Sequence, residues 1–382
     1  MFGQLDDEQH AIQATVARFA QEQIAPHAAE WDEHDYFPRE LMASLAQLGL
    51  TGMTVPEEHG GTGLSRLTAA VVYEALAGAD LSVVVWLGVH NMAAGIIASY
   101  GDEAQRGRWL PGLISGDLLG AFSLSETNAG SDAASLQAVA RRDGDSYVLN
   151  GTKQWVTSGS VADVFIVMLR TANAPGSAGI SAFVVEKGTP GFTIGKIERK
   201  MGLHASPTAE LIFTECRIPA SHLLQQEGMG LRIALSALDG GRINIAAGAT
   251  GVAQAAYMVA LRYAQERQQF GHPIVEFQAI QFLLADMAMG IEASRLLTYR
   301  AAAVLDEHGR ATKEAAMAKC FATDMAMRVT IDAIQVLGGA GYVRDWPLER
   351  FMRDIKITQI FEGTNQIQRL VIAREVQRSS SL

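Results

Sequence analysis

The pattern of apolar and polar positions divides the chain into three parts. In the first, apolar residues recur at helical spacing after the acidic start Asp6-Asp7-Glu8, which is typical of a helix N-terminus. The stretch from Val83 to Ile97 is the most apolar, but His90 and Asn91 interrupt it, so it predicts a buried helix and not a membrane span. We therefore expect helices from residue 5 to about residue 120.

The second and third parts differ in period and composition. Short runs rich in β-branched and aromatic residues follow Leu119, separated by Gly, Pro, Asn and Asp, and predict a small β domain. These runs are Tyr147–Leu149, Val164–Leu169, Ala182–Val185 and Leu211–Phe213. After Gly230 the chain is alanine-rich, and Ile243–Glu266, Phe277–Glu307 and Lys313–Leu337 are long enough for bundle helices. We expect a mostly α protein with a central β domain, divided at 1–120, 121–226 and 227–382.

Charge and cysteine content narrow the function classes. The formal net charge of −10 argues against binding to nucleic acid, which requires basic patches. Cys216 and Cys320 are the only cysteines, and no metal-ligand spacing occurs, so we expect free thiols, a reducing compartment and no metal. The acidic N-terminus lacks a signal pattern. We expect a soluble cytoplasmic protein with no membrane partner, or a protein of the mitochondrial matrix if a transit peptide was removed.

One carboxylate has the local setting of a catalytic base. Glu362 lies between Phe361 and Gly363, just before a helical run. The apolar neighbours Ile360 and Phe361 should raise its pKa toward neutrality, and Gly363 lets a ligand approach the backbone. Such a carboxylate suits proton abstraction next to a carbonyl. The alternative is a glutamate that only stabilises a helix N-terminus.

Four further segments have chemistry of their own, and each also has a purely structural interpretation. The loop Ser123–Asp132 exposes hydroxyls and amides that suit a planar ring or a phosphate, but it also fits a Ser-rich turn. Asn150-Gly151 predicts a hairpin. Taken alone, the nearby Trp155 is best interpreted as an aromatic residue of the core. Arg267–Gly271 fits the C-terminus of a helix, and the glycines of Gln335–Tyr342 permit close approach of a second chain.

The order of these motifs resembles the acyl-CoA dehydrogenase family over essentially the whole chain. The string IFEGTNQIQR at residues 360–369 is similar to the family's C-terminal motif, in which the glutamate removes the α-proton of an acyl-CoA thioester. The resemblance is greatest to the isobutyryl-CoA and short-chain acyl-CoA dehydrogenases. It implies an N-terminal helical domain, a middle β-barrel-like domain and a C-terminal four-helix bundle, with FAD as the cofactor. A subset of the family carries its base at position 241, where this chain has glycine.

The resemblance also implies a set of site residues. Glu362 would be the catalytic base. FAD would contact Phe122, Leu124, Ser125, Gly130, Ser131, Trp155, Val156, Thr157, Thr364 and Gln366, and across a subunit interface Arg267, Phe270, Gln278, Gln335, Gly338 and Gly339. The acyl-CoA would contact Ser131, Asp239, Arg242, Gly363 and Arg374. Trp86, His90 and Met92 fit two interpretations, one in which they line or cap the acyl site and one in which they only pack between helices.

These resemblances predict an FAD-dependent α,β-dehydrogenation of a short or branched acyl-CoA such as isobutyryl-CoA. They imply electron transfer flavoprotein as the electron acceptor and a homo-oligomer that is at least a dimer and by family analogy a dimer of dimers. A straight-chain short or medium acyl-CoA dehydrogenase and an oxidase or monooxygenase of the same fold stay open. So do a non-catalytic acyl-CoA-binding protein and, from another class, an all-helical interaction module.

Overall fold

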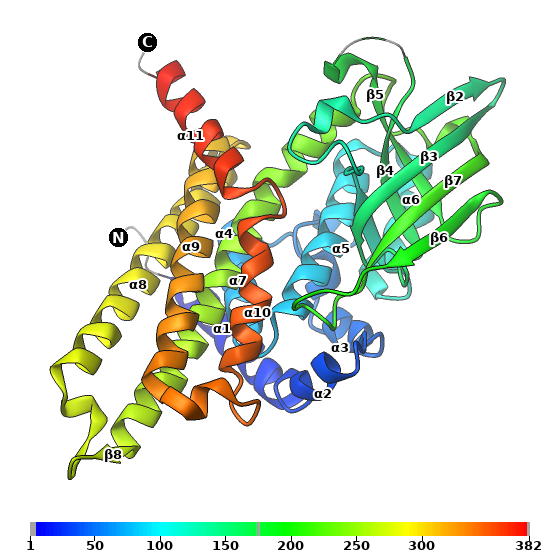
Figure 1. Cartoon of the computed structure of the whole chain (residues 1–382). Coiled ribbons are helices and arrows are strands. Elements are labelled where there is room, and N and C mark those ends of the chain that lie inside the picture. The colour runs from blue at the N-terminus through cyan, green and yellow to red at the C-terminus, as the bar shows by residue number, and fades with distance from the viewer. Residues whose placement is uncertain (1–4, 173, 175, 380–382) are drawn as a thin grey trace.

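The computed structural model describes residues 5–172, 174 and 176–379. Its N-terminal part is helical, as predicted (Figure 1). The helices are α1 (Asp7–Phe19), α2 (Ala28–Glu33), α3 (Leu41–Gln47), α4 (Arg66–Ala77), α5 (Leu81–Tyr100) and α6 (Glu103–Ser115), and a short π-helix at Ala20–Ile24 continues α1. The acidic start is a capping box, in which Asp6 and Gln9 each accept a hydrogen bond from the other's backbone N–H.

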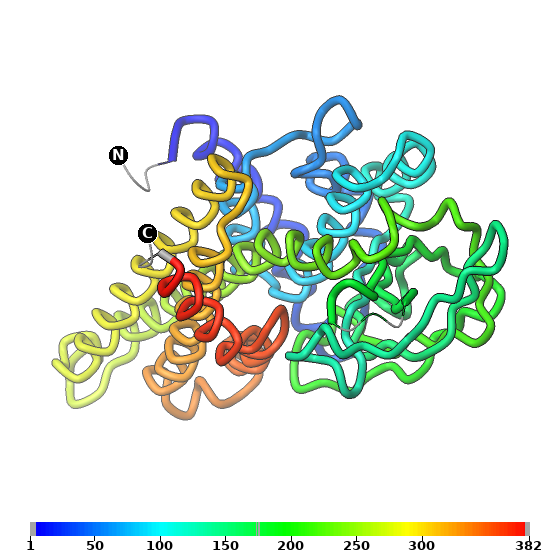
Figure 2. Tube along the Cα trace, turned by 90° about the horizontal axis from the view of Figure 1, so that it is seen from above, coloured from blue at the N-terminus to red at the C-terminus, as the bar shows by residue number. Residues whose placement is uncertain are grey.

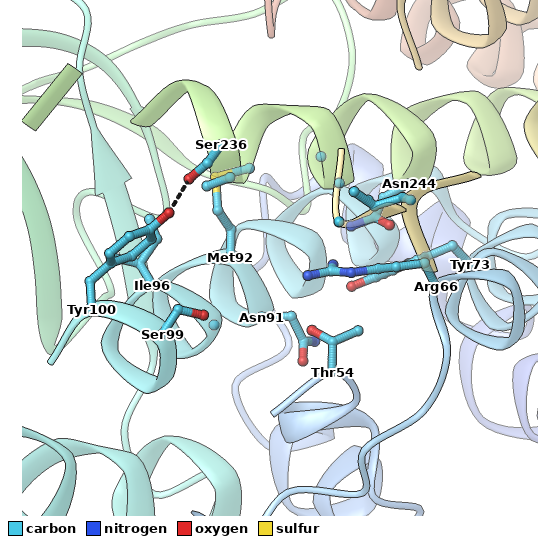
Figure 3. A pocket seen from close by; sticks show the side chains of 16 residues that line it. Thr54, Arg66, Tyr73, Asn91, Met92, Ile96, Ser99, Tyr100, Ser236 and Asn244 are labelled. Carbon is cyan, nitrogen blue, oxygen red and sulfur yellow. Dashed lines mark hydrogen bonds between the residues drawn. The ribbon is translucent and has the colours of Figure 1, made fainter. Parts of the chain in front are cut away.

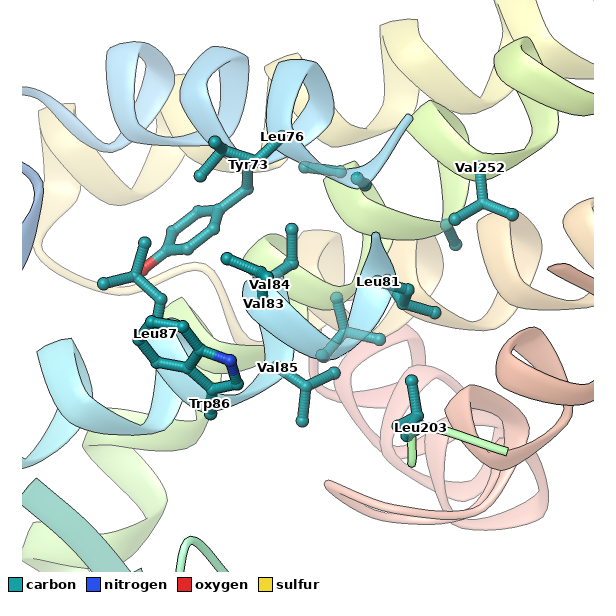
Figure 4. Packing of buried hydrophobic residues seen from close by; sticks show 14 of the residues in the cluster. Tyr73, Leu76, Leu81, Val83, Val84, Val85, Trp86, Leu87, Leu203 and Val252 are labelled. Atoms are coloured by element: carbon teal, nitrogen blue, oxygen red, sulfur yellow. The ribbon is translucent and has the colours of Figure 1, made fainter. Parts of the chain in front are cut away.

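Two long helices form the centre of the molecule. One is α5, and the other is α7 (Gly230–Glu266), which Figure 2 shows running across the molecule toward the β domain. By length and composition alone both could cross a membrane, but 78% and 72% of their most apolar stretches are buried inside the protein. Figure 4 shows apolar side chains of α4 and α5 packing together, with Val252 of α7 nearby. These helices therefore have the burial of core helices.

The middle of the chain folds into a curled sheet, which the described residues build from seven strands. They are β1 (Gly120–Ser123), β2 (Val139–Asp143), β3 (Ser146–Thr157), β4 (Val164–Arg170), β5 (Ile180–Glu186), β6 (Phe192–Ile197) and β7 (Thr208–Pro219). The order is β1-β4-β2-β3-β7-β6, with β5 paired to β4. The four predicted runs are confirmed as β3, β4, β5 and β7. The sequence pattern missed β1, β2 and β6, which are short.

The predicted hairpin at Asn150-Gly151 is wrong. Strand β3 continues through both residues, and its register with β7 shifts between Leu149 and Gly151. Gly151 has φ +132° and lies so close to Ala138 that a Cβ there would be 2.6 Å from the Ala138 Cβ. Asn150 and Glu215 bond to each other across the irregularity. The Asn-Gly pair therefore marks a β-bulge, which also requires a glycine and a short polar residue.

The C-terminal part is a helix bundle. It contains α7, α8 (Gln278–His308), α9 (Thr312–Leu337), the shorter α10 (Leu348–Lys356) and α11 (Asn365–Ser379). The segment between α7 and α8 holds the small strands β8 (Gln268–Gln269) and β9 (His272–Pro273). The chain is helical again from Gly230, as predicted, and the segment expected as a bundle helix from residue 243 is part of the longer α7, which passes through Gly240 and Gly241 without a break. Packing against neighbouring elements outweighs the low helix propensity of these glycines.

Candidate active site

The carboxylate of Glu362 is directed into a cavity and not toward a helix end. Glu362 (φ +53°) and Gly363 (φ +88°) form a left-handed turn just before α11. Thr364 takes the capping role, because its hydroxyl accepts the backbone N–H of Ile367 at 3.3 Å. The Glu362 atom Oε2 is buried and has no hydrogen-bond partner among the described residues. The interpretation of Glu362 as a helix cap is therefore wrong.

Burial gives this carboxyl group the proton affinity of a base. It raises the pKa of Glu362 to about 7, while the nearby charges of Arg242 and Lys319 lower it and only partly offset the effect. The predicted direction is confirmed, but one of the two predicted causes is not, because Ile360 is 48% exposed. The close packing comes instead from α5 and α7. A Cβ at Gly241 would lie 2.6 Å from Glu362 Oε2 and 2.7 Å from Met92 Cε.

Position 241 is thus directly opposite the base. Any larger residue there would displace the Glu362 carboxyl group or Met92, since real Cβ atoms do not approach other atoms this closely. The alternative base position of the family and the Glu362 position therefore converge on one point in space. Glycine at 241 leaves that point to Glu362.

A buried lysine that the motifs did not reveal holds the turn that carries the base. Lys319 of α9 is fully buried and donates to the Gly363 carbonyl and to Asn365 Oδ1, both at 2.9 Å. Gln368 Nε2 donates to the carbonyls of Glu362 (3.1 Å) and Gly363 (2.8 Å). These donors fix the backbone and leave the carboxylate free. The sequence signal was a single lysine in the alanine-rich segment 315–322, where a buried charge is unusual.

Arg242 connects the base to a second polar group. Its Nη1 lies 3.2 Å from Asp239 Oδ1, and its Nε lies 3.4 Å from the Glu362 carbonyl. Asp239 Oδ2 also accepts the Thr312 hydroxyl at 2.8 Å. The predicted substrate residue Arg374 lies at the surface beside Glu375. Burial lowers the pKa of Arg242, and the nearby positive charge of Arg374 lowers it further. Asp239 and Arg374 are thus near the cavity but do not line it.

The cavity at Glu362 has a volume of about 220 Å³ and collects most of the predicted residues of this subunit. They come from three distant parts of the chain: β1 and the loop after it, strand β3, and the C-terminal helical part. The predicted residues that line it are Phe122, Leu124, Ser125, Gly130, Ser131, Trp155, Val156, Thr157, Arg242, Glu362 and Gly363. Thr364 and Gln366 lie next to this wall in the chain but do not line the cavity.

The loop after β1 is held by a buried ion pair. Lys153 Nζ lies 2.8 Å from Glu126 Oε1 and donates to the Leu124 carbonyl at 3.1 Å. The Glu126 carboxylate also accepts the backbone N–H groups of Gln137 and Ala138. Glu126 and Ala129 bond to each other across a tight turn. The loop is thus both the turn that local composition suggested and part of the cavity wall.

Trp155 separates this cavity from a second one. Trp155 has φ +56° and is 54% exposed. The interpretation of Trp155 as an aromatic residue of the core is therefore wrong. The second cavity, of about 400 Å³, shares Val85, Trp155, Thr157 and Phe361 with the first. An exposed indole in a left-handed backbone conformation on the wall of two cavities marks Trp155 as a candidate functional residue.

Two of the three residues considered for the acyl site are structural. His90 Nε2 contacts the carbonyls of Thr51 and Leu113, its Nδ1 accepts the Gly120 N–H, and burial lowers its pKa to about 4. Trp86 is fully buried and packs edge-on against Phe37. The interpretation in which these two line the site is wrong, whereas Met92 does line the cavity.

Three family models match consecutive parts of the chain. The N-terminal, middle and C-terminal domains of acyl-CoA dehydrogenase match residues 6–117, 121–216 and 228–377. The chain belongs to the acyl-CoA dehydrogenase family.

Relatives of known structure or function resemble the chain over its full length. Isobutyryl-CoA dehydrogenase of Dictyostelium discoideum is 45% identical over 98% of this chain and 90% of the relative. The solved butyryl-CoA dehydrogenase of Megasphaera elsdenii is 44% identical, with a TM-score of 0.95 over 98% of this chain and 99% of the other. A chain in the structure described as the electron transferring flavoprotein of Acidaminococcus fermentans is 45% identical, with a TM-score of 0.96 over 98% and 99%.

This acyl-CoA dehydrogenase is thus a flavin-dependent oxidoreductase by family, and its site fits a flavin ring. The hydroxyls of Ser125, Ser131 and Thr157 line the cavity beside the exposed indole of Trp155. Hydroxyl groups can hydrogen-bond the oxygen and nitrogen edge of such a ring. The residues present therefore suit the cofactor of the family.

The residues predicted to reach a neighbouring subunit lie at one end of the bundle. Figure 1 shows the β8–β9 segment and the turn between α9 and α10 at the same end. Arg267 is the C-cap of α7, as its local pattern indicated, Phe270 is 92% exposed, and Gln278 is the first residue of α8. Gln335 is near the end of α9, and Gly338 and Gly339 are in the following 3-10 turn. None of them lines the Glu362 cavity, so their cross-subunit role stays a prediction.

Proposed function

We propose that this protein catalyses the FAD-dependent α,β-dehydrogenation of a short or branched-chain acyl-CoA. The observation that carries the proposal is the buried, unpartnered Oε2 atom of Glu362, in the same cavity as Ser131 and Trp155. A carboxyl group whose pKa is about 7 is half ionised at neutral pH. Its pKa is then close to neutral pH, which is the condition under which a general base is most effective.

The reaction removes two hydrogens from neighbouring carbons. Glu362 takes the α-proton, and the electron pair of that C–H bond becomes the π bond as the hydride leaves the β-carbon. FAD, when bound, supplies the redox chemistry by accepting that hydride. The cofactor would be held by the loop after β1 and by β3, through Ser125, Trp155 and Thr157. The product is the 2-enoyl-CoA, and the proton stays on Glu362 until solvent removes it.

Negative charge that develops on the thioester oxygen needs a donor. The backbone N–H of Glu362 donates to no other group in the described part of the chain. The Lys319 and Gln368 side chains hold the carbonyls of Gly363 and Glu362, which fixes the turn that contains this N–H. A preorganised donor of this kind stabilises an enolate more strongly than water does, because it needs no reorientation.

A short or branched acyl group fits the described cavity. Met92, Val85 and Val89 of α5 narrow the 220 Å³ space next to the base. The similarity to the isobutyryl-CoA and butyryl-CoA enzymes supports the same choice. A straight short-chain substrate is the second candidate, which the butyryl-CoA relative favours. The test is the rate of flavin bleaching with isobutyryl-, butyryl- and octanoyl-CoA. Preference for octanoyl-CoA would exclude a short-chain enzyme, and no bleaching by any acyl-CoA would exclude the activity.

The electron acceptor and the assembly follow from the same family. We propose electron transfer flavoprotein as the acceptor, supported by the similarity to the Acidaminococcus fermentans structure. We also propose a homo-oligomer, at least a dimer, in which Arg267 and Gln335 contact the cofactor of a neighbouring subunit. Loss of bound FAD in an Arg267→Ala variant, with secondary structure retained, is the expected result. Full FAD content in a monomeric preparation would contradict the shared site.

A further inference from the structure

Another pocket lies beside the catalytic cavity, between α5 and α7. It has a volume of about 200 Å³, and Met92 lines both spaces. Gly241, which faces the carboxyl group of Glu362, also lines it. Figure 3 shows this second space, which we call the distal pocket, with Arg66 and Tyr73 of α4 pointing into it. Met92 therefore lies on the shared wall of the catalytic cavity and the distal pocket.

The distal pocket is polar where an alkyl chain would need an apolar wall. The guanidinium group of Arg66 forms no hydrogen bond with any described residue, and burial lowers its pKa. The hydroxyl of Tyr73 is fully buried and has no partner. The side chain of Asn244, on α7, also lines the space without a hydrogen-bond partner in the described chain. Three polar side chains are thus left with open hydrogen-bonding capacity at one point.

The backbone makes room for this charge. A Cβ at Gly240 would lie 2.9 Å from Arg66 Nη1, so a larger residue there would move the guanidinium group from its present position. Asn91 also lines the pocket, but its side chain is already bonded to Met53 N and to the carbonyls of Leu50 and Leu87. Asn91 is therefore structural, whereas Arg66 is open to a ligand. The Asp306 carboxylate lies near Arg66, but it accepts from the backbone N–H groups of Arg66 and Leu67 and not from the guanidinium group, whose donors therefore stay available to a ligand.

We propose that the distal pocket binds a carboxylate at the far end of the acyl chain, with Arg66 as its anchor and Tyr73 and Asn244 as its hydrogen-bond partners. A guanidinium group matches a carboxylate through two parallel hydrogen bonds, which a methyl group cannot replace. This inference rests on the proposed acyl-CoA dehydrogenation. Isobutyryl-CoA is short enough to stay on the catalytic side of Met92, so both kinds of acyl group are compatible with one enzyme.

The geometry also limits the length of the chain. A Cβ built on Gly240 would lie 2.9 Å from Arg66 Nη1, and a Cβ built on the next residue, Gly241, would lie 2.6 Å from Glu362 Oε2. Neighbouring Cα atoms are about 3.8 Å apart, so the two side-chain atoms are at most about 12 Å apart. Contacts of about 3 Å at each end leave about 6 Å, which holds about four C–C bonds. Acyl groups of up to about six carbons fit.

The test compares two six-carbon thioesters that differ only at the end of the chain, adipyl-CoA and hexanoyl-CoA. Dissociation constants are measured by calorimetry in the flavin-loaded Glu362→Gln variant, which binds without turning over. We expect adipyl-CoA to bind roughly 10- to 100-fold more tightly, the range of one charge-assisted pair. Arg66→Met should remove this difference, and Arg66→Lys should keep part of it. Arg141→Met, which removes an exposed arginine on β2, is the matched control.

A second variant protects the test against misfolding of Arg66→Met. Tyr73→Phe removes a hydroxyl that forms no hydrogen bond with any residue that the structure describes, so the fold should not change. We expect it to weaken adipyl-CoA binding about threefold or more without affecting hexanoyl-CoA. If isobutyryl-CoA is oxidised but adipyl-CoA binds no better than hexanoyl-CoA, the distal pocket holds only water and the assignment is overturned. If no acyl-CoA binds or is oxidised, the proposed function and this inference fail together.

Discussion

Two buried glutamate–lysine neighbourhoods in this protein have opposite consequences. In the β domain, Lys153 contacts the Glu126 carboxylate directly, and two backbone N–H groups complete its shell. In the C-terminal part, Lys319 donates to the Gly363 carbonyl and to Asn365. The Glu362 atom Oε2 has no hydrogen-bond partner among the described residues. Burial lowers the pKa of both lysines to about 8. The difference is therefore in where the donors point, not in which residues are present.

The comparison shows how one pair of residue types can serve as a structural tie or as a base. When a lysine and two backbone N–H groups are directed at a carboxylate, they stabilise its negative charge. When the donors are directed at the backbone, they hold the geometry and leave the proton affinity high.

Replacing Glu362 with Gln should abolish catalysis and leave the fold intact. We expect kcat to fall by roughly 10³- to 10⁴-fold, the upper range for loss of a general base. The measurement is dye-linked oxidation of isobutyryl-CoA, with flavin content and thermal midpoint as controls. Turnover within tenfold of the original enzyme would show that another group removes the proton.

Replacing Lys153 with Met should destabilise the protein, because it leaves the Glu126 carboxylate without its buried partner. Removing one member of a buried ion pair typically costs about 3–5 kcal/mol of unfolding free energy. Denaturant unfolding of the flavin-loaded protein measures it. An unchanged midpoint would mean that the two backbone N–H groups suffice for Glu126.

Replacing Lys319 with Met should change the base itself. The positive charge of Lys319 lowers the pKa of Glu362, so its loss should raise that pKa further. We expect kcat/KM at pH 7 to fall roughly tenfold, with partial recovery at higher pH, where the carboxyl group ionises again. The acidic limb of the pH profile reports the shift. Lys153→Met is the control, and a shift of equal size there would contradict the distinction.

The pH dependence of activity and of stability should run in opposite directions. Activity should rise as the pH passes about 7, because Glu362 must be ionised to act. The folded pKa of Glu362 lies above its usual value of 4.5, so the folded state binds more protons between pH 4.5 and 7. Stability from this group is complete below that window and decreases as the pH rises through it.

Thermal midpoints at pH 5 and pH 8 measure this linkage. Glu362→Gln should show a smaller decrease between the two than the original protein. Asp354, whose pKa burial raises to about 8, contributes in the same direction and remains in both proteins. Equal decreases in the two proteins would show that Glu362 is not the group responsible.

Part of the architecture could be predicted because it depends on local pattern. Helix α5 follows from apolar content, β4 and β5 from β-branched runs, and the cap at Asp6 from its side chain. The short edge strands β1 and β6 have no strong pattern of their own, because pairing with neighbours defines them. The hairpin prediction at Asn150-Gly151 is wrong for a related reason. Glycine occurs both in β-bulges and in tight hairpin turns, and only the pairing with the partner strand distinguishes the two.

The sequence by itself determined the family, the candidate base and the direction of its pKa, because motif order, residue type and a glycine beside a carboxylate are properties of the chain. Only the tertiary structure decided that Gly241 and Met92 enclose Glu362, that Lys319 holds its backbone, and that His90 is structural. The tertiary structure alone also decided that Arg66 lines the distal pocket beside Tyr73 and Asn244. Burial and the direction of a donor are set by segments far apart in the chain, and no local pattern records which of them meet.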